Sequence, residues 1–368
     1  MLNNRKGVCA LKIIHTADFH LDSPFSFLTV AKRNERRNEL ILAFKNMVSW
    51  ALDNEVAAVI IAGDFFDSSS VSAKTKSIVW AEIEKAKDIN FYYLSGNHDD
   101  ETAVFANQEL PNNLKLFTDN FYTYYEGGVA ISGIALNNSN YQNFYNNIQL
   151  NKEFFNIVVM HGEIVNTNHL KDSNSISLKR LNKNINYLAL GHYHAHATGQ
   201  LEDGGIYAYS GCLEPRGFDE LGDKGFVVVD INDNGKATYS FVKQNIRTFH
   251  EVKVDITNCV ELSSQEHAIA KAIVGIETKD LVKVVLTGEY LPNSRLDVEY
   301  LEKYLAQKFY FAKIYNHSKL KINLEELKYD ASLKGEFIRT VLDQKNLSQE
   351  LAQDVIMCGV SALLGQEV

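Results

Sequence analysis

Residues 57–64 read AAVIIAGD, an apolar run that ends in a glycine and an aspartate. Four other stretches have this form, with apolar residues first and polar residues at the end: Lys12–Asp18, Phe91–Asn97 (FYYLSGN), Asn156–Gly162 (NIVVMHG) and Tyr187–His194 (YLALGHYH). Nearly continuous apolar runs of this length are typical of strands that are buried on both faces. Because the helical patterns at Lys32–Asp53 and Ala73–Lys87 lie between such runs, we expect an α/β layered fold.

The rest of the chain continues the alternation of strand and helix patterns. An Asp-Asn-Gly sequence at residues 233–235 predicts a hairpin between Phe226–Ile231 and Ala237–Val242. After Thr248–His250 the stretches are shorter, and from Ala331 the apolar spacing is helical. We therefore expect three parts: a main domain at residues 1–248, a smaller α/β domain at 249–330 and a helical segment at 331–368.

The composition is that of an ordinary globular protein, since 45% of the 368 residues are hydrophobic and 23% are charged. The net charge of −9 argues against a passive nucleic-acid coat, but not against an enzyme with a local basic groove. The four cysteines are far apart, so we expect neither a disulfide framework nor a cysteine zinc site. The short apolar runs predict no membrane span, and we expect no signal peptide, so the cytoplasm is the default location.

Polar side chains stand where the five expected strands end. In layered α/β proteins ligands bind outside one edge of the strands, so these ends should meet at one place. The candidate donors are Asp18, His20, Asp64, Asn97, His161, His192 and His194. Carboxylate, imidazole and amide groups without a thiolate suit Mn²⁺, Fe²⁺ or Zn²⁺. They are more donors than one four-coordinate ion needs, so two ions that share a carboxylate are the economical interpretation.

Each motif has a plainer interpretation when it is taken alone. An aspartate or histidine at a strand end is usually a solvated turn residue, and Gly96 and Asn97 are residues that turns favour. All five motifs occur in series, each after an apolar run, and this series argues against the turn interpretation.

The series DFH, GDFFD, GNHD, HGE and GHYH resembles the signature of the calcineurin-like metallophosphoesterases. Within that family, KIIHTADFHLDSPF and YSGCLEPRGFDELGDKGFVVVDI resemble the SbcD-type DNA repair exonucleases, and more narrowly their YhaO-like branch. The resemblance covers about residues 11–245, and more loosely the C-terminal part, which stands in the place of the family's capping domain. It implies a four-layer α/β fold, a β-sandwich of two mixed sheets flanked by helices. The apolar runs alone would suggest a doubly wound parallel sheet.

The resemblance also implies a role for each candidate residue. Asp18, His20 and His194 would hold one ion, and a second ion would be held by Asn97, His161 and His192. Asp64 would bridge the two. The ions would be divalent, with Mn²⁺ placed before Fe²⁺ or Zn²⁺. His98 matches the catalytic histidine that protonates the leaving oxygen, and Asp67 takes a supporting role.

Other polar residues near these motifs have two interpretations each. Asp99 would either orient the His98 imidazole or cap a helix through Glu101–Ala106, and we favour the cap. Arg216 and Lys224 would either bind phosphate or lie at the surface. A basic cluster at the start of the first helix is either a solvated helix face, which we favour, or a phosphate track: Lys32, Arg33, Arg36 and Arg37.

The expected function is that of a Mn²⁺-dependent DNA repair nuclease that hydrolyses phosphodiester bonds by a two-metal mechanism. The resemblance implies an SMC-like ATPase of the SbcC type as partner, and a homodimer is a further expectation. The helices from Ala331 to Gln366 would dock that partner or merely pack on the second domain. Two alternatives remain: a phosphodiesterase or phosphatase that acts on nucleotides, other small molecules or phosphoproteins, and a metal-free scaffold. The complete ligand set argues against the scaffold.

Overall fold

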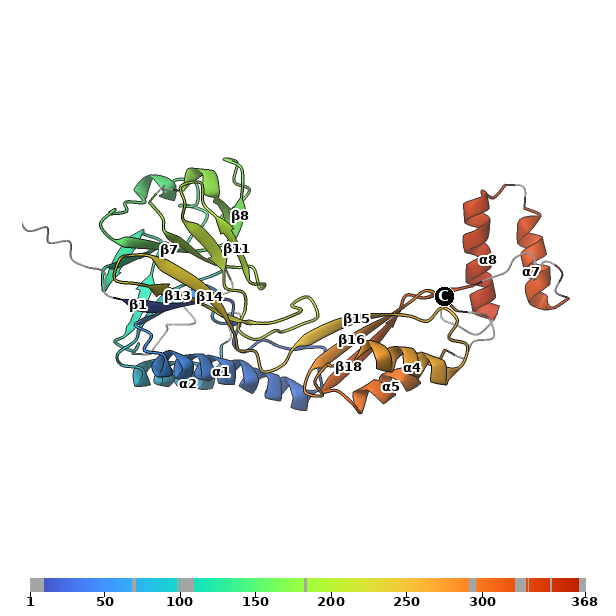
Figure 1. Cartoon of the computed structure of the whole chain (residues 1–368). Helices are drawn as coiled ribbons and strands as arrows, with labels where there is room; N and C mark the ends of the chain where they lie inside the picture. The colour runs from blue at the N-terminus through green and yellow to red at the C-terminus, as the bar shows by residue number, and fades with distance from the viewer. Residues whose placement is uncertain are drawn as a thin grey trace, which may run out of the picture. The chain divides into compact units, whose positions relative to one another are not determined.

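The computed structural model describes residues 10–67, 71–97, 99, 109–181, 184–290, 296–321, 329, 331–344 and 346–363. They belong to two compact units, Met1–Thr248 and Phe249–Val368 (Figure 1). Over these residues, none of the helices combines the length and the apolar character that crossing a bilayer requires.

The first unit contains two six-stranded mixed sheets and a two-stranded sheet of β8 (Glu163–Val165) and β9 (Ser175–Ser177). The first sheet has the order β14-β13-β1-β2-β3-β4, with the bounds β1 (Leu11–Thr16), β2 (Ala58–Ala62), β3 (Asn90–Leu94), β4 (Leu114–Phe117), β13 (Gly225–Ile231) and β14 (Ala237–Lys243). The second has the order β11-β12-β10-β7-β6-β5, with the bounds β5 (Tyr122–Glu126), β6 (Val129–Gly133), β7 (Phe155–His161), β10 (Tyr187–Gly191), β11 (Ala197–Gln200) and β12 (Ile206–Tyr209). Strands β1 to β4 are parallel to one another, and β13 and β14 form the predicted hairpin.

The sheets pack face to face around one apolar core. Ile13 and Ile60 of the first sheet and Ile157 and Ala189 of the second belong to the same buried cluster. Helices α1 (Val30–Asp53) and α2 (Ala73–Lys85) lie together beside the first sheet (Figure 1). Successive side chains of a strand point to opposite faces, so a strand between a second sheet and a helix layer is apolar throughout. The structure confirms the β-sandwich flanked by helices.

The second unit has a parallel three-stranded sheet in the order β15-β16-β18. Its elements are β15 (Phe249–Asp255), α4 (Leu262–Ala272), β16 (Leu281–Thr287), β17 (Glu289–Tyr290), α5 (Val298–Ala306), β18 (Phe311–Asn316), β19 (Lys319–Leu320), α7 (Leu333–Leu342) and α8 (Gln349–Leu363). Ile338 of α7 and Val360 of α8 belong to the same buried cluster as Val284 of the sheet. The helical pair therefore contributes to the core of this unit, and the further domain boundary at 330 stays a prediction.

Arg36 in α1 does not belong to a basic surface. Its side chain is fully buried and donates hydrogen bonds to Glu39, to Glu214 Oε1 at 2.8 Å and to the Pro215 carbonyl at 2.7 Å. Glu214 also accepts the backbone N–H groups of residues 246 and 247. For Arg36, both the solvated helix face and the phosphate track are wrong, because its buried charge binds Glu214, which in turn binds the loop at residues 246 and 247.

Candidate metal centre

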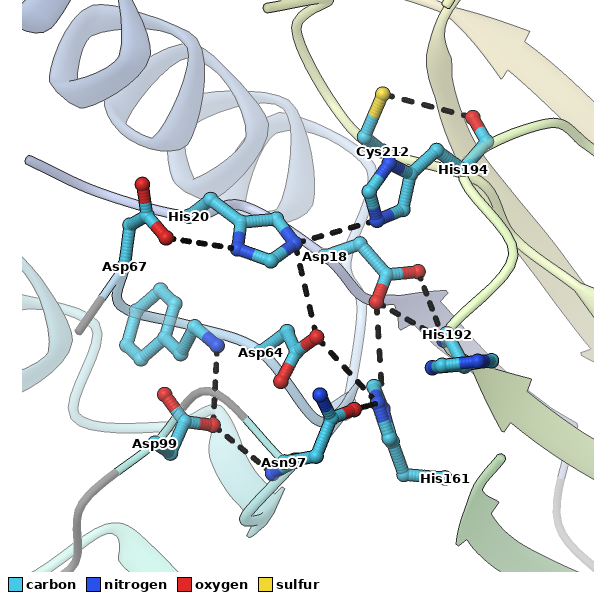
Figure 2. A network of polar contacts seen from close by, with 12 residues as sticks. Asp18, His20, Asp64, Asp67, Asn97, Asp99, His161, His192, His194 and Cys212 are labelled. Carbon is cyan, nitrogen blue, oxygen red and sulfur yellow. Dashed lines mark hydrogen bonds and ion pairs between the residues drawn. The ribbon is translucent and has the colours of Figure 1, made fainter. Parts of the chain in front are cut away.

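The loops that follow the strands bring the predicted ligands together in one polar network (Figure 2). Asp18 and His20 follow β1, Asp64 and Asp67 follow β2, Asn97 and Asp99 follow β3, His161 ends β7, and His192 and His194 follow β10. Since β1, β2 and β3 are parallel neighbours, as are β7 and β10, each sheet brings its own carboxyl ends together. His98 lies outside the described residues.

Four ligand candidates lie on left-handed backbone. The φ angles are +54° at Asp18, +46° at His20, +51° at Asp64 and +103° at His192. Such angles are uncommon for residues other than glycine, and they cluster at functional sites. Backbone hydrogen bonds of 3.0 Å from the Asp18 N–H to the Gly63 carbonyl and from the His20 N–H to the Asp64 carbonyl hold the two loops in register.

A glycine is required where Gly96 approaches Asp64. A Cβ atom at Gly96 would lie 2.1 Å from Asp64 Oδ1 and 2.4 Å from the Asp64 backbone nitrogen. No real Cβ contact is that short, so the small residue before Asn97 lets the loop after β3 close onto the carboxylate.

The first group of donors consists of Asp18, His20 and His194, whose ligand atoms lie within 4.8 Å of one another. His20 Nε2 is 3.2 Å from His194 Nε2 and 3.6 Å from Asp64 Oδ2. Two imidazole nitrogens that bind one ion at about 2.0–2.1 Å in tetrahedral geometry lie about 3.3–3.4 Å apart. The spacing of these two nitrogens therefore fits a shared cation.

The second group consists of Asp18, Asp64 and His161. His161 Nε2 is 3.4 Å from Asp64 Oδ2 and 3.0 Å from Asn97 Oδ1, and the rings of His161 and His192 are 5.3 Å apart. Asp64 Oδ2 thus lies near an imidazole from each sheet. The Asp18 carboxylate accepts the backbone N–H of His192 at 2.9 Å, and Asp18 belongs to both groups of donors.

The centre concentrates negative charge in a buried place. Asp18 is 0% and Asp64 1% exposed. Burial, followed by the charge of Asp64, raises the pKa of Asp18 to about 6. Burial opposes protonation of His161, but the hydrogen bond and charge of Asp64 raise its pKa to about 9. Buried carboxylates are stable only beside compensating cations, and oxygen and imidazole donors together suit borderline divalent metals. The residues present therefore fit two divalent ions.

The supporting residues lie around His20 and His194. Asp67 Oδ1 is 3.7 Å from His20 Nδ1, and Asp67 Oδ2 accepts the Ser23 hydroxyl at 2.9 Å. Arg216 Nη1 is 4.0 Å from Asp67 Oδ2. Lys224 is 2% exposed and its Nζ donates to the His194 carbonyl at 3.0 Å, so the surface position that we left open for Lys224 is wrong.

Sequence reasoning missed Glu220, which contacts His194. Its carboxylate accepts from His194 Nδ1 at 2.7 Å and from the Arg216 side chain. Burial opposes ionisation, but the hydrogen bond with His194 and the charge of Arg216 bring the pKa of Glu220 to about 2. The only signal for it in the sequence is its position four residues after Arg216.

Asp99 joins the loops that follow β2 and β3. Its carboxylate accepts the N–H groups of Phe65 at 3.2 Å, Phe66 at 2.9 Å and Gly96 at 3.0 Å. Burial raises the pKa of Asp99. The helix cap that we favoured involves residues 101–106, which lie outside the described residues. Among the described residues, the contacts of Asp99 join two loops that carry candidate ligands.

Replacing Asp99 with alanine should lower the free energy of unfolding by about 2–4 kcal/mol, because three backbone donors lose their acceptor. Urea denaturation of the metal-free protein measures this change. Asp172 is a matched control, since it accepts N–H and hydroxyl groups in an exposed turn, and Asp172→Ala should cost less than about 1 kcal/mol. Equal losses in the two variants would contradict the role given to Asp99.

Comparison with known proteins agrees with this geometry. The family model "Calcineurin-like phosphoesterase" matches residues 11–220, more than half of the chain, and this span contains every candidate metal ligand. The chain is 26% identical over 318 residues to YhaO of Bacillus subtilis strain 168, which is described as an uncharacterized metallophosphoesterase. That alignment covers 79% of this chain and 76% of YhaO.

Two further similarities have lower identity. The DNA double-strand break repair protein Mre11 of Sulfurisphaera tokodaii is 23% identical over 309 residues, with 79% of this chain and 77% of Mre11 covered. The crystal structure of a dimetal phosphatase from Danio rerio aligns with a TM-score of 0.41 and 11% identity, over 64% of this chain and 100% of that chain. The SbcD-type placement stays a prediction. By the span of the family match, the chain belongs to the calcineurin-like phosphoesterase family.

Proposed function

We propose that this phosphoesterase hydrolyses phosphodiester bonds of DNA at a centre of two divalent ions. Asp18, His20 and His194 bind one ion, Asn97, His161 and His192 bind the other, and Asp64 bridges them. The observation that supports this assignment most strongly is the position of Asp64 Oδ2, which is 3.6 Å from His20 Nε2 and 3.4 Å from His161 Nε2. A single carboxylate oxygen between imidazoles of the two sheets suits a bridging ligand.

Two divalent ions bound there would lower the pKa of a bound water and neutralise charge on the phosphate. The chain itself holds the donors still: Asp18 and Asp64 are buried, and His161 Nδ1 lies 2.9 Å from the Ala62 carbonyl. His98 is the proposed proton donor to the leaving oxygen. Its two neighbours in the sequence are held by the fold, since Asn97 Oδ1 contacts His161 and Asp99 accepts three backbone N–H groups.

DNA is the proposed substrate because the relative from Sulfurisphaera tokodaii is named as a DNA double-strand break repair protein. Mn²⁺ is the proposed metal, the cytoplasm the proposed location, and homodimerisation a further proposal.

For an SMC-like ATPase of the SbcC type we propose the helical pair α7 and α8 as the docking element. These helices bury Ile338 and Val360, but leave Leu333, Leu342 and Leu351 at least 45% exposed.

The deciding experiment offers the protein 3′- and 5′-labelled duplex and single-stranded DNA beside cyclic nucleotides and phosphoproteins, all with Mn²⁺. We expect DNA products with Mn²⁺ and none after the metal is removed with EDTA, because the attacking water depends on the ions. The Asp64→Asn variant, purified in parallel, controls for contaminating nucleases. Hydrolysis of only the nucleotides or phosphoproteins would replace the nuclease proposal with the alternative substrate class.

A further inference from the structure

One donor histidine of the centre has a buried carboxylate behind it. His194 turns Nε2 toward His20, at 3.2 Å, and its other ring nitrogen, Nδ1, lies 2.7 Å from Glu220 Oε1. A neutral imidazole that donates from Nδ1 presents its lone pair at Nε2. The Glu220 contact thus selects the tautomer in which His194 can bind a cation on the side of His20.

Glu220 is itself held in a fixed position. It is 4% exposed, and its Oε2 accepts the Arg216 backbone N–H at 2.7 Å. The Arg216 guanidinium donates to Oε1 from Nη2 at 3.0 Å and from Nε at 3.2 Å. The Cys212 thiol lies 3.5 Å from Oε2. With both oxygens engaged, the carboxylate cannot swing away from His194 without breaking several hydrogen bonds.

The other side of the centre has a different kind of support. His161 turns Nε2 toward Asp64 and Asn97, and its Nδ1 lies 2.9 Å from the backbone carbonyl of Ala62. A carbonyl fixes the orientation of the ring but carries no net charge. A carboxylate behind a ligating imidazole also raises its basicity, and removing such a partner typically costs 10–100-fold in metal affinity.

We propose that Glu220 is a positioning residue that makes the two metal positions unequal, by holding His194 so that the Asp18–His20–His194 position binds its ion more tightly than the His161 position. Arg216 anchors the Glu220 carboxylate, and its Nη2 also lies 3.3 Å from His194 Nδ1. This inference rests on the two-metal centre proposed above.

The test is a Mn²⁺ titration of the full chain in which electron paramagnetic resonance counts the free ion. We expect the wild-type protein to bind two equivalents with different affinities. In Glu220→Gln, which keeps the shape of the side chain but loses its charge, the tighter equivalent should weaken by about 10–100-fold, while the weaker one stays within about twofold.

Glu214→Gln is the matched control. Glu214 is also a buried glutamate that binds an arginine and backbone N–H groups, but its hydrogen bonds go to Arg36 and the residue 246–247 loop. We expect it to lower the melting temperature and to leave both Mn²⁺ affinities unchanged. An equal loss of affinity in both variants, or unchanged affinities in Glu220→Gln, would overturn the role of Glu220 while the two-metal centre stands.

The remaining outcomes are also decisive. A wild-type protein that binds fewer than two equivalents would remove the two-metal proposal and this inference together. If thermal melting shows that Glu220→Gln does not fold, the same titration is made on Glu220→Asp, which keeps the charge but ends one methylene short of His194. We expect Glu220→Asp to lose less Mn²⁺ affinity at the tighter position than is expected for Glu220→Gln. An unchanged affinity in Glu220→Asp would contradict the inference.

Discussion

The Asp64→Asn variant should lose both metal ions together, and its rate of phosphodiester hydrolysis should fall by at least about 10³-fold. Asp64 Oδ2 lies within 3.6 Å of an imidazole nitrogen from each of the two sheets. An amide at this place keeps the volume but removes the charge that two neighbouring cations need. Elemental analysis after gel filtration should therefore find two equivalents of bound Mn²⁺ in the wild-type protein and none in the variant.

A thermal melt with and without Mn²⁺ gives a second readout. Ions that bind only the folded state stabilise it by about 2.7 kcal/mol at a hundredfold excess over the dissociation constant, so the wild-type melting temperature should rise with Mn²⁺ and that of the variant should not. Asp280→Asn is the control, because Asp280 is also buried beside a histidine, with 2.9 Å between Asp280 Oδ2 and His250 Nε2, in the second unit. Retention of one equivalent by Asp64→Asn would show that the bridge is misassigned.

The His98→Ala variant should keep both ions and lose about 10²–10⁴-fold in turnover of DNA, as expected when a general acid is removed. The loss should depend on the leaving group. The alkoxide that departs from DNA needs a proton, whereas a nitrophenolate is stable without one. We therefore expect a much smaller loss on a nitrophenyl phosphodiester than on DNA.

The metal content separates this effect from damage to the centre. His169→Ala, at an exposed histidine of the same unit, should be unchanged in metal content and turnover. An equal loss on both substrates by His98→Ala would assign His98 to substrate binding rather than to proton transfer, and a loss of metal would make it a ligand.

The positions of the strands and of the candidate ligands could be predicted because both are local properties of the sequence. An apolar run that stops at Gly63-Asp64 or at Gly96-Asn97 shows where a strand ends and which polar groups follow it. The layer that covers each strand could not be read in this way. A strand such as β2 is equally apolar whether its second face meets a helix or another sheet, and the sandwich came from the family resemblance.

The contacts that sequence reasoning did not find join residues that are far apart in the sequence. Arg36 finds Glu214 178 residues further on, and Asp99 reaches back to Phe65 and Phe66. Helical periodicity places Arg36 at the start of a helix but says nothing of a carboxylate from another loop. Glu220 was missed for the same reason. Its role depends on the contact with His194, and only folding brings the two residues together.

The left-handed backbone at Asp18, His20, Asp64 and His192 bears on how such a chain would change under selection. Each of these residues is strained by about 1–3 kcal/mol, a strain that glycine would relieve. A protein retained merely as a rigid platform would become more stable by exchanging all four for glycine. Their presence together marks a molecule that tolerates a less stable backbone in order to keep its reactive groups.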